Sequence, residues 1–405
     1  MTPAPDSERF ALAAAALLLA LLLVTTLAPA QWASLPDFDK AYYPAGRKAL
    51  VAPGTLYAAE VVDFVNVPIV ALLFMPFALL DESSARLAFS LTGVAAVTLT
   101  VVWLARACGL TPWARAGVLA LVVLSGPLHY SFALGNASHL LLPLLLAVFA
   151  ADRAGRDATA GALLALAAVV KIPLLVLPLH FLLGRRWRAL AAFGVTLAGV
   201  ATLSLALFGL ELHRTWFLRC IQPFAQGPLA AYNVQSVDGL LARLMTEAGR
   251  QDWSPVAVGP AFLALRSALI ALLLGAVVAA CWPRGGVARG GASTLGLSIV
   301  LTLALLVSPI SWTHYYVFLS LPLAFLIGGW IRAPRFRGWL ALVAAGALLV
   351  TLPVLAAPGR GGSVLRWLYR ATAHSPHFVG GLLLLAALIV ARRAGPEDRV
   401  RPASS

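Results

Sequence analysis

Long apolar runs alternate with short polar loops along almost the whole chain, beginning with the run from Phe10 to Ala30. The hydrocarbon core of a bilayer is about 30 Å thick, so a helix needs about 20 apolar residues to cross it. The longest polar stretch, 211–260, still contains many apolar residues and leaves no room for a separate soluble domain. The pattern therefore predicts an all-α, polytopic membrane protein of about 12 transmembrane helices, with residues 1–405 forming a single domain.

Basic residues concentrate in alternate loops, and this alternation predicts the orientation of the helices. Cytoplasmic loops of membrane proteins carry an excess of Lys and Arg. The basic loops contain Arg106 and Arg115; Arg153 and Arg156; Arg185, Arg186 and Arg188; Arg284 and Arg289; Arg332, Arg335 and Arg337; and Arg392 and Arg393. We expect these loops on the cytoplasmic side, with residues 392–405 as a cytoplasmic tail.

Two runs must be interpreted in a particular way to keep this alternation. The run from Ala158 to Leu183 crosses twice and folds back at Lys171 and Pro173, since proline interrupts helical hydrogen bonding. The run from Val65 to Leu80 is too short to cross and suits a re-entrant or juxtamembrane helix on the outer side. Two long extracytoplasmic loops result, 31–86 and 211–260, and both termini lie inside.

The end of the first run leaves an alternative open. The sequence "APAQ" resembles a signal-peptidase site, which would make the run a cleaved signal peptide. The preceding "PDSER" is not basic, however, and many further apolar runs follow. An uncleaved first helix is therefore the favoured interpretation.

Composition supports an integral membrane protein and argues against two other classes. Of the 405 residues 61% are hydrophobic and 11% charged, whereas soluble domains carry about 25% charged residues. The net charge of +14 comes from short Arg groups between apolar runs, which suits a bilayer surface better than nucleic acid. The three cysteines form no CxxC pair, so we expect neither a disulfide framework nor a zinc site.

The unusual polar residues fall almost entirely on the predicted outer side. They are Asp37 and Asp39 in "LPDFDKAYYPAG", Asn136 and Ser138 in "GNASH", Lys171 in "KIP", Asn233, Gln235 and Ser236 in "AYNVQS", and Trp312 and His314 in "SPISWTHYY". A carboxylate that takes a proton from an acceptor hydroxyl, beside cations that stabilise a departing phosphate, suits group transfer from a lipid-linked phosphate donor.

Each of these residues also has a simpler structural interpretation. The two acids could be solvated or cap a helix, and Lys171 could extend its ammonium group to the interface. His314 lies between aromatic residues that are typical of an interfacial belt. The amides and hydroxyls could serve as loop caps. Their shared location on one side of the membrane is what favours a common site.

The order of these motifs resembles the integral-membrane glycosyltransferases of the GT-C class, and within it glycosyltransferase family 87, the polyprenol-phosphate-mannose-dependent α-mannosyltransferases of bacteria. The resemblance rests on "DFDKAYYPAGRKAL", "FVNVPIVALLFMPFALL", "GNASHLLLPLLLAVFA", "AGALLALAAVVKIPLLVLP", "YNVQSVDGLLARL" and "SPISWTHYYVFLSLPL". It implies a GT-C-type fold whose first outer loop contains juxtamembrane or re-entrant helices. It also implies a donor flipped to the outer face of the plasma membrane, with polyprenyl phosphate as the leaving group.

The resemblance assigns roles to individual residues. An aspartate of the first outer loop is the general base, and Asp37, which carries the Asp-Phe dipeptide, is preferred to Asp39. Lys171 and His314 would bind the donor phosphate, and Asn136, Ser138, Asn233, Gln235, Ser236 and Trp312 the substrates. The family often has Gly-Gln-x-Asn at Gly135–Ser138 and Trp-Asp-His at Trp312–His314, so this chain departs from the pattern at both places.

We therefore expect an inverting hexosyltransferase that acts on a glycolipid or glycan acceptor without a cofactor. No DxD pair or carboxylate cage is present in the sequence, so metal-independent catalysis is expected. Two alternatives remain at this point. One is a GT-C enzyme that uses another polyprenyl-phosphate sugar, and the other is a transporter or flippase of a lipid-linked or acidic solute.

Overall fold

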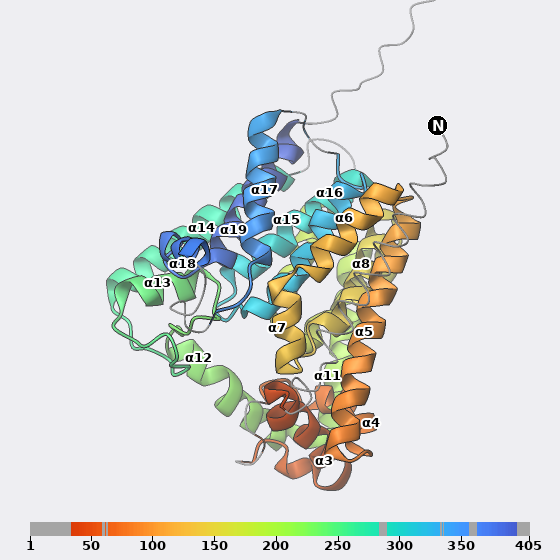
Figure 1. Ribbon diagram of the computed structural model, residues 1–405. Helices are drawn as coiled ribbons and strands as arrows, with labels where there is room; N and C mark the ends of the chain where they lie inside the picture. Colours follow the sequence, from red (N-terminus) through yellow and green to blue (C-terminus); the bar gives the residue numbers. More distant parts are fainter. Residues whose placement is uncertain are drawn as a thin grey trace, which may run out of the picture.

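The chain folds into a bundle of helices of very different lengths (Figure 1). A computed structural model describes residues 34–394 apart from 59, 60, 62, 63, 283–289, 333, 335 and 356–362. Within these ranges every regular element is a helix, and the extended backbone is limited to one isolated bridge between Val234 and Trp312. The prediction of an all-α protein is confirmed.

Helices long and apolar enough to cross a membrane are present in the part of the chain that the structure describes. Among the described residues four helices are long and apolar enough to cross a bilayer, or five if one bent pair is a single span. The four are α5 (Glu82–Ala107), α11 (Trp187–Trp216) with its continuation to Ala225, α14 (Pro260–Cys281) and α19 (Pro376–Ala394). The bent pair is α6 (Pro112–Val123) with α7 (Gly126–Leu134), which meet at 48°. The count of about 12 stays a prediction, and its first helix, Phe10–Ala30, lies outside the described residues.

The remaining elements are shorter, and many lie inside the bundle. Towards the N-terminus they are η1 (Phe38–Tyr42), α3 (Tyr43–Val51), η2 (Pro53–Thr55), η3 (Pro68–Phe74), α4 (Met75–Ala78), η4 (His139–Leu141), α8 (Leu142–Arg153), α9 (Asp157–Val170), η5 (Ile172–Val176) and α10 (Pro178–Leu183). Towards the C-terminus they are η6 (Phe217–Ile221), α12 (Gln222–Gln226), α13 (Val237–Met245), α15 (Gly291–Val307), η7 (Thr313–Leu319), α16 (Ser320–Ile327), α17 (Arg337–Thr351) and α18 (Ser363–Ala371).

The loops rich in arginine meet at one end of the bundle, called here the arginine end. Trp330 donates its indole N–H to the carbonyl of Ala107, and Arg153 donates to the carbonyl of Trp330, each at 3.3 Å. The amide of Gly290 donates to the carbonyl of Arg153 at 3.3 Å. The ends of α5, α8 and α16 and the start of α15 therefore lie together.

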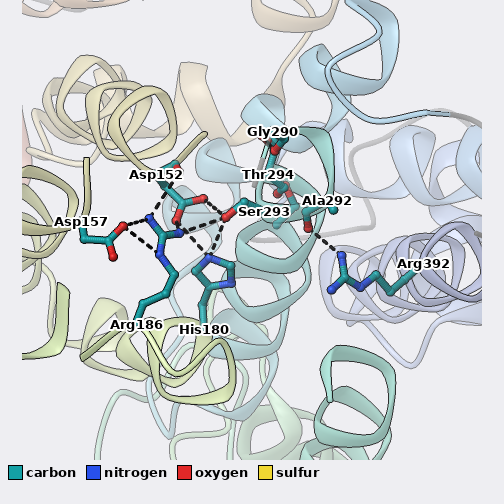
Figure 2. Close-up of polar contacts among 10 residues, drawn as sticks. Asp152, Asp157, His180, Arg186, Gly290, Ala292, Ser293, Thr294 and Arg392 are labelled. Carbon is teal, nitrogen blue, oxygen red and sulfur yellow. Dashed lines mark hydrogen bonds and ion pairs between the residues drawn. The ribbon is translucent and has the colours of Figure 1, made fainter. Parts of the chain in front are cut away.

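A buried ionic network joins several helices at the arginine end (Figure 2). Arg186 is ion-paired with both Asp152 and Asp157. Ser293 donates to Asp152 at 2.7 Å, and His180 lies 3.1 Å from the same carboxylate. Because Asp152 is fully buried, these partners replace the water that its charge has lost. The network connects α8, α9, the α10–α11 corner and α15.

This network also shows that residues 157–186 form a hairpin. Asp157 begins α9, and its partner Arg186 immediately precedes α11. The chain therefore leaves the arginine end along α9, turns at Lys171, and returns along η5 and α10. The predicted fold-back at Lys171 and Pro173 is seen, with legs shorter than ordinary spans.

The opposite end, called here the site end, is built mainly from residues 34–80. Figure 1 shows α3 and α4 around the lower end of α5, where α11 also ends. The run from Val65 to Leu80 forms η3 and α4, and Pro68–Ala78 is one of the shorter apolar helices. It packs so closely on α3 that a Cβ on Gly46 would lie 2.6 Å from the carbonyl oxygen of Phe74. Its predicted re-entrant or interfacial position stays a prediction.

Candidate active site

The two acids of the first loop have different partners. The Asp39 carboxylate accepts a hydrogen bond from the Leu35 amide at 2.9 Å and one from the Arg86 guanidinium at 2.7 Å. Asp37 lies two residues earlier in the chain and accepts a hydrogen bond from Asn136 Nδ2 at 2.6 Å. Asp39 therefore binds α5, whereas Asp37 points to the loop that follows α7.

Asn136 connects Asp37 with the buried lysine. Its Nδ2 group lies 3.3 Å from the Tyr42 hydroxyl as well as bonding to Asp37, while its Oδ1 atom accepts from Lys171 Nζ at 2.9 Å. The same Oδ1 accepts from the amide and hydroxyl of Ser138 at 3.0 and 2.8 Å. With both ends of the amide engaged, its orientation is fixed, and Asp37 and Lys171 are held on opposite sides of one side chain.

Gly135 makes this arrangement possible at the level of the backbone. It ends α7 with φ +67°, a left-handed conformation that favours glycine. A Cβ at this position would lie 2.7 Å from the Cβ of Phe38. The absent side chain therefore allows the Asn136 turn to approach η1 and meet Asp37.

Lys171 is only 4% exposed and lies where α9 ends. Its ammonium group sits 4.9 Å from the centre of the Tyr315 ring. A buried cation requires compensation, which comes here from the Asn136 oxygen and the aromatic face. An ionisable residue in an otherwise apolar stretch is a functional candidate, and its position beside Asp37 strengthens that interpretation.

His314 is buried among aromatic rings close to Lys171. Its ring centre lies 4.8 Å from that of Tyr315, 6.2 Å from that of Tyr130 and 6.5 Å from that of Trp312. Among the described residues neither ring nitrogen has a hydrogen-bond partner. Leaving such a group unsatisfied costs about 1–3 kcal/mol, so a polar ligand is the natural partner of this imidazole.

The loop that carries Asn233 lies beside these rings. Asn233 donates to the Tyr130 hydroxyl at 3.2 Å and accepts from the Trp253 indole at 3.0 Å. The hydroxyls of Tyr130 and Tyr232 are 3.2 Å apart. These bonds extend the polar surface from His314 towards the long outer loop.

Two loops far apart in the sequence are joined through their backbones next to the site. The amide of Gln235 donates to the carbonyl of Ser311 at 2.7 Å, and the amide of Thr313 donates to the carbonyl of Asn233 at 2.8 Å. These bonds flank the Val234–Trp312 bridge. The "YNVQS" and "SPISWTH" motifs therefore form one unit.

Gln235 and Ser236 bond mainly to the protein itself. The side-chain amide of Gln235 donates through Nε2 to the carbonyls of Tyr232 and His374, and its Oε1 atom accepts from the backbone amide of Phe378. Ser236 caps α13 by accepting from the Gly239 amide, and it donates to the carbonyl of Pro309. The structure thus places both residues in the framework that holds the loop, while Asn233 and Trp312 lie nearer to His314.

The tyrosines are the site residues that the sequence reasoning missed. Asn136 contacts Tyr42, and Asn233 contacts Tyr130. Tyr315 contacts both His314 and Lys171. Burial and the nearby Asp37 carboxylate raise the pKa of Tyr42 well above its ordinary value, so this phenol stays neutral and can donate a hydrogen bond. Tyr42 and Tyr315 lie within the motifs quoted above, and Tyr130 lies shortly before "GNASH". Only the folded chain distinguishes these tyrosines from aromatic residues of the membrane interface.

In the part of the chain that the structure describes, no three His, Cys, Asp or Glu side chains come together as metal ligands. Metal-independent catalysis stays a prediction. What the site presents is a carboxylate, an ammonium group and an imidazole, surrounded by phenol and amide groups. A carboxylate can take a proton, and the two nitrogen groups can stabilise a developing anion.

The apolar helices that surround these polar groups are those of a helical membrane protein. The sequence profile of Glycosyltransferase family 87 matches residues 64–309, more than half of the 405 residues, and the chain belongs to this family. The resemblance stated from the sequence is confirmed. Membership of an enzyme family also favours catalysis over the transporter alternative.

Three characterised relatives agree with this assignment. A protein of Mycolicibacterium smegmatis, the polyprenol-phosphate-mannose-dependent alpha-(1-2)-phosphatidylinositol pentamannoside mannosyltransferase, is 29% identical over 80% of each chain. A Mycobacterium tuberculosis H37Rv protein named for phosphatidylinositol mannoside is 27% identical over 86% of this chain and 83% of its own. A second pentamannoside mannosyltransferase, from strain CDC 1551, is 29% identical over 76% of this chain and 71% of its own.

Proposed function

We propose that this protein transfers mannose from a polyprenyl-phosphate donor to a hydroxyl of a glycolipid acceptor of the phosphatidylinositol mannoside type. The family and the names of the three relatives support the donor, the sugar and the acceptor. The structural observation that carries the proposal is the link from Asp37 through Asn136 to Lys171. It holds a base and a cation at a fixed spacing in an otherwise apolar bundle.

The reaction is a single inverting displacement. Asp37 takes the proton of the acceptor hydroxyl, whose oxygen forms the new bond to the anomeric carbon. The bond from that carbon to the phosphate oxygen breaks, and the electron pair leaves with polyprenyl phosphate. A β-linked donor then gives an α-glycoside. One carboxylate suffices because phosphate is a good leaving group that needs charge stabilisation more than a proton.

Lys171 and His314 would stabilise the departing phosphate. Hydrogen bonds to charged groups contribute about 1.5–3 kcal/mol each. His314 has both ring nitrogens free of partners in the described structure, which suits a group that binds its ligand only when substrate is present. Lys171 lies against Tyr315, the ring that also contacts His314, so both can reach one anion.

Asp37 is preferred as the base because Asp39 already has two protein partners. The Arg86 guanidinium and the Leu35 amide satisfy its carboxylate and would compete with an acceptor hydroxyl. Asp37 instead accepts a hydrogen bond from Asn136, whose side chain is a neutral amide.

The proposed location of the reaction is the extracytoplasmic face of the plasma membrane. The arginine end holds the loops that the charge rule assigns to the cytoplasm, and the site lies at the other end of the bundle. A donor made in the cytoplasm would then be flipped before use.

The experiment is transfer of labelled mannose in proteoliposomes. Purified protein is incubated with radiolabelled polyprenyl-phosphate-mannose and a phosphatidylinositol mannoside acceptor, and the product is resolved by chromatography. Polyprenyl-phosphate glucose and arabinose serve as donor controls. We expect a mannosylated product only with the mannose donor. Consumption of another donor alone would contradict the assignment of the sugar, and no consumption of any donor would contradict the class.

A further inference from the structure

A second group of cations, called here the basic patch, lies on the far side of the loop that carries Tyr232 and Asn233. It consists of Arg243, Arg250, Arg370 and His374. Arg250 donates to His374 Nε2 at 2.7 Å, and Arg243 donates to the carbonyl of Ala231 at 2.7 Å and to the Ser375 hydroxyl at 2.7 Å. Within the described ranges no carboxylate pairs with any of these three arginines.

The protons of the patch can be assigned from its contacts. Arginine has only donors, so His374 Nε2 must accept the bond from Arg250, and the hydrogen resides on Nδ1. His374 Nδ1 and Arg243 Nε are both buried, and in the described structure neither has a partner. Burial, followed by the charges of Arg250, Arg243 and Arg370, lowers the pKa of His374, in agreement with a neutral ring. The patch therefore has more donors than acceptors, and an anion would correct the imbalance.

The backbone of the patch is strained. Ala373 and His374 follow α18 with φ of +49° and +59°, and neither is glycine. Their amides bond back to the carbonyls of Arg370 and Tyr369, which ends α18 tightly. Residues in such conformations cost about 1–3 kcal/mol each and cluster at functional sites. These conformations end α18, and the His374 ring that follows bonds to Arg250.

The position of the patch along the bundle indicates what kind of anion it meets. His374 lies two residues before Pro376, where the candidate span α19 begins. The first turn of a crossing helix lies at the level of the lipid headgroups. In α18, Trp367 and Val364 are 65% and 71% exposed. Exposed tryptophan beside arginine is typical of a helix that lies in the membrane interface.

We propose that Arg250 and Arg370, with His374 behind them, bind the phosphodiester of a phospholipid headgroup, while Trp367 and Val364 contact the interfacial region of the same leaflet. Guanidinium groups present paired N–H donors that match phosphate oxygens. The phosphate would supply the negative charge that no described carboxylate gives to Arg250 and Arg370. No group is transferred at this site.

The basic patch adjoins the candidate active site through Tyr232. The Tyr232 amide donates to the carbonyl of Arg250 at 2.9 Å, and its hydroxyl lies 3.2 Å from that of Tyr130, whose ring neighbours His314. A phospholipid held at the patch would have its headgroup substituents close to this loop. The binding proposal does not depend on which sugar is transferred, because it concerns the phosphodiester alone.

The test measures lipid binding and not catalysis. Detergent-purified protein is titrated with dioctanoyl-phosphatidylinositol, with dioctanoyl-phosphatidylcholine and with inorganic phosphate. The variant carries Arg250→Gln and Arg370→Gln. The control carries Arg188→Gln and Arg393→Gln, which remove two exposed arginines at the arginine end with the same change in charge. Thermal unfolding of each protein confirms that it is folded.

We expect the patch variant to bind dioctanoyl-phosphatidylinositol about tenfold or more weakly than wild type, with the control within about twofold. Anionic lipid should bind more tightly than the zwitterionic lipid. Equal weakening in both variants, or none in the patch variant, would overturn the proposal. Displacement of the lipid by inorganic phosphate at equal concentration would assign the site to free phosphate and contradict a headgroup site.

Discussion

Asp39 is bonded to Arg86 at 2.7 Å, although the two residues come from different elements of the site end. This ion pair joins η1 to the first turns of α5 and satisfies one of the two acids of the first loop. Asp37, two residues earlier, accepts a hydrogen bond from the side-chain amide of Asn136. We therefore expect neutralisation of Asp37 to reduce activity and neutralisation of Asp39 to reduce mainly stability.

Asp37→Asn should lower kcat by about 10²–10⁴, because it removes the proposed general base. Asp39→Asn should retain activity within about tenfold and lower stability by about 1 kcal/mol, since its ion pair is partly exposed. Mannosyl transfer in proteoliposomes and thermal unfolding measure the two effects. Arg86→Gln is the matched control and should behave like Asp39→Asn. A loss for Asp39→Asn equal to that for Asp37→Asn would refute the choice of base.

The sequence could group Asp37, Lys171 and His314 because loop alternation and motif order require no knowledge of packing. It could not separate Asp37 from Asp39, because the distinction depends on Arg86, 47 residues from Asp39 and brought near only when α5 packs on η1. The framework role of Gln235 likewise depends on Phe378, 143 residues away. Such contacts leave no periodic signal in the sequence.

The helix count shows a related limit of hydropathy. The hairpin at Ala158–Leu183 could be predicted from the sequence, because the run is apolar and a proline interrupts it. Hydropathy does not show that α9 is a helix of 14 residues enclosed by α8 and α11, because buried helices and lipid-exposed helices have the same composition.

His314→Phe should separate stability from activity. The imidazole has no partner among the described residues, so an apolar ring removes an unsatisfied buried group and should leave stability unchanged or raise it by about 1–3 kcal/mol. Mannosyl transfer should fall about 10- to 100-fold, because a charge-assisted bond to the leaving phosphate is lost. Thermal unfolding and initial rates give the two quantities. A destabilised variant with full activity would identify His314 as a structural aromatic.

Lys171→Met should impair both donor binding and turnover. Its ammonium group is buried against Tyr315 and bonded to Asn136, and methionine fills a similar volume without the charge. We expect kcat to fall about 10²-fold and KM for the donor to rise, because in the proposed mechanism the cation contacts the phosphate before and during its departure. Lys40→Met, an exposed lysine in the same loop region, is the control and should retain full activity. Unchanged donor kinetics in Lys171→Met would remove the lysine from the proposed mechanism.

Asp152→Asn should destabilise the arginine end without a specific effect on chemistry. The carboxylate is fully buried and contacts Arg186, His180 and Ser293, as Figure 2 shows. Removing one partner of a buried pair costs about 3–5 kcal/mol, because the guanidinium is left uncompensated. Unfolding in denaturant measures the loss, and activity per folded molecule should stay near wild type. An equally stable variant would show that water replaces the carboxylate and that the network is not a structural requirement.

The orientation of the bundle can be tested with two single cysteines on opposite ends. Ser254 is exposed in the loop beyond Trp253, and Arg188 is exposed at the start of α11. After Cys108, the half-buried native cysteine, is changed to serine, Ser254→Cys should react with a membrane-impermeant maleimide in intact cells. Arg188→Cys should react only after permeabilisation, because the arginine end is predicted to face the cytoplasm. The reverse pattern would place the carboxylate, lysine and imidazole on the cytoplasmic side and would contradict use of a flipped donor.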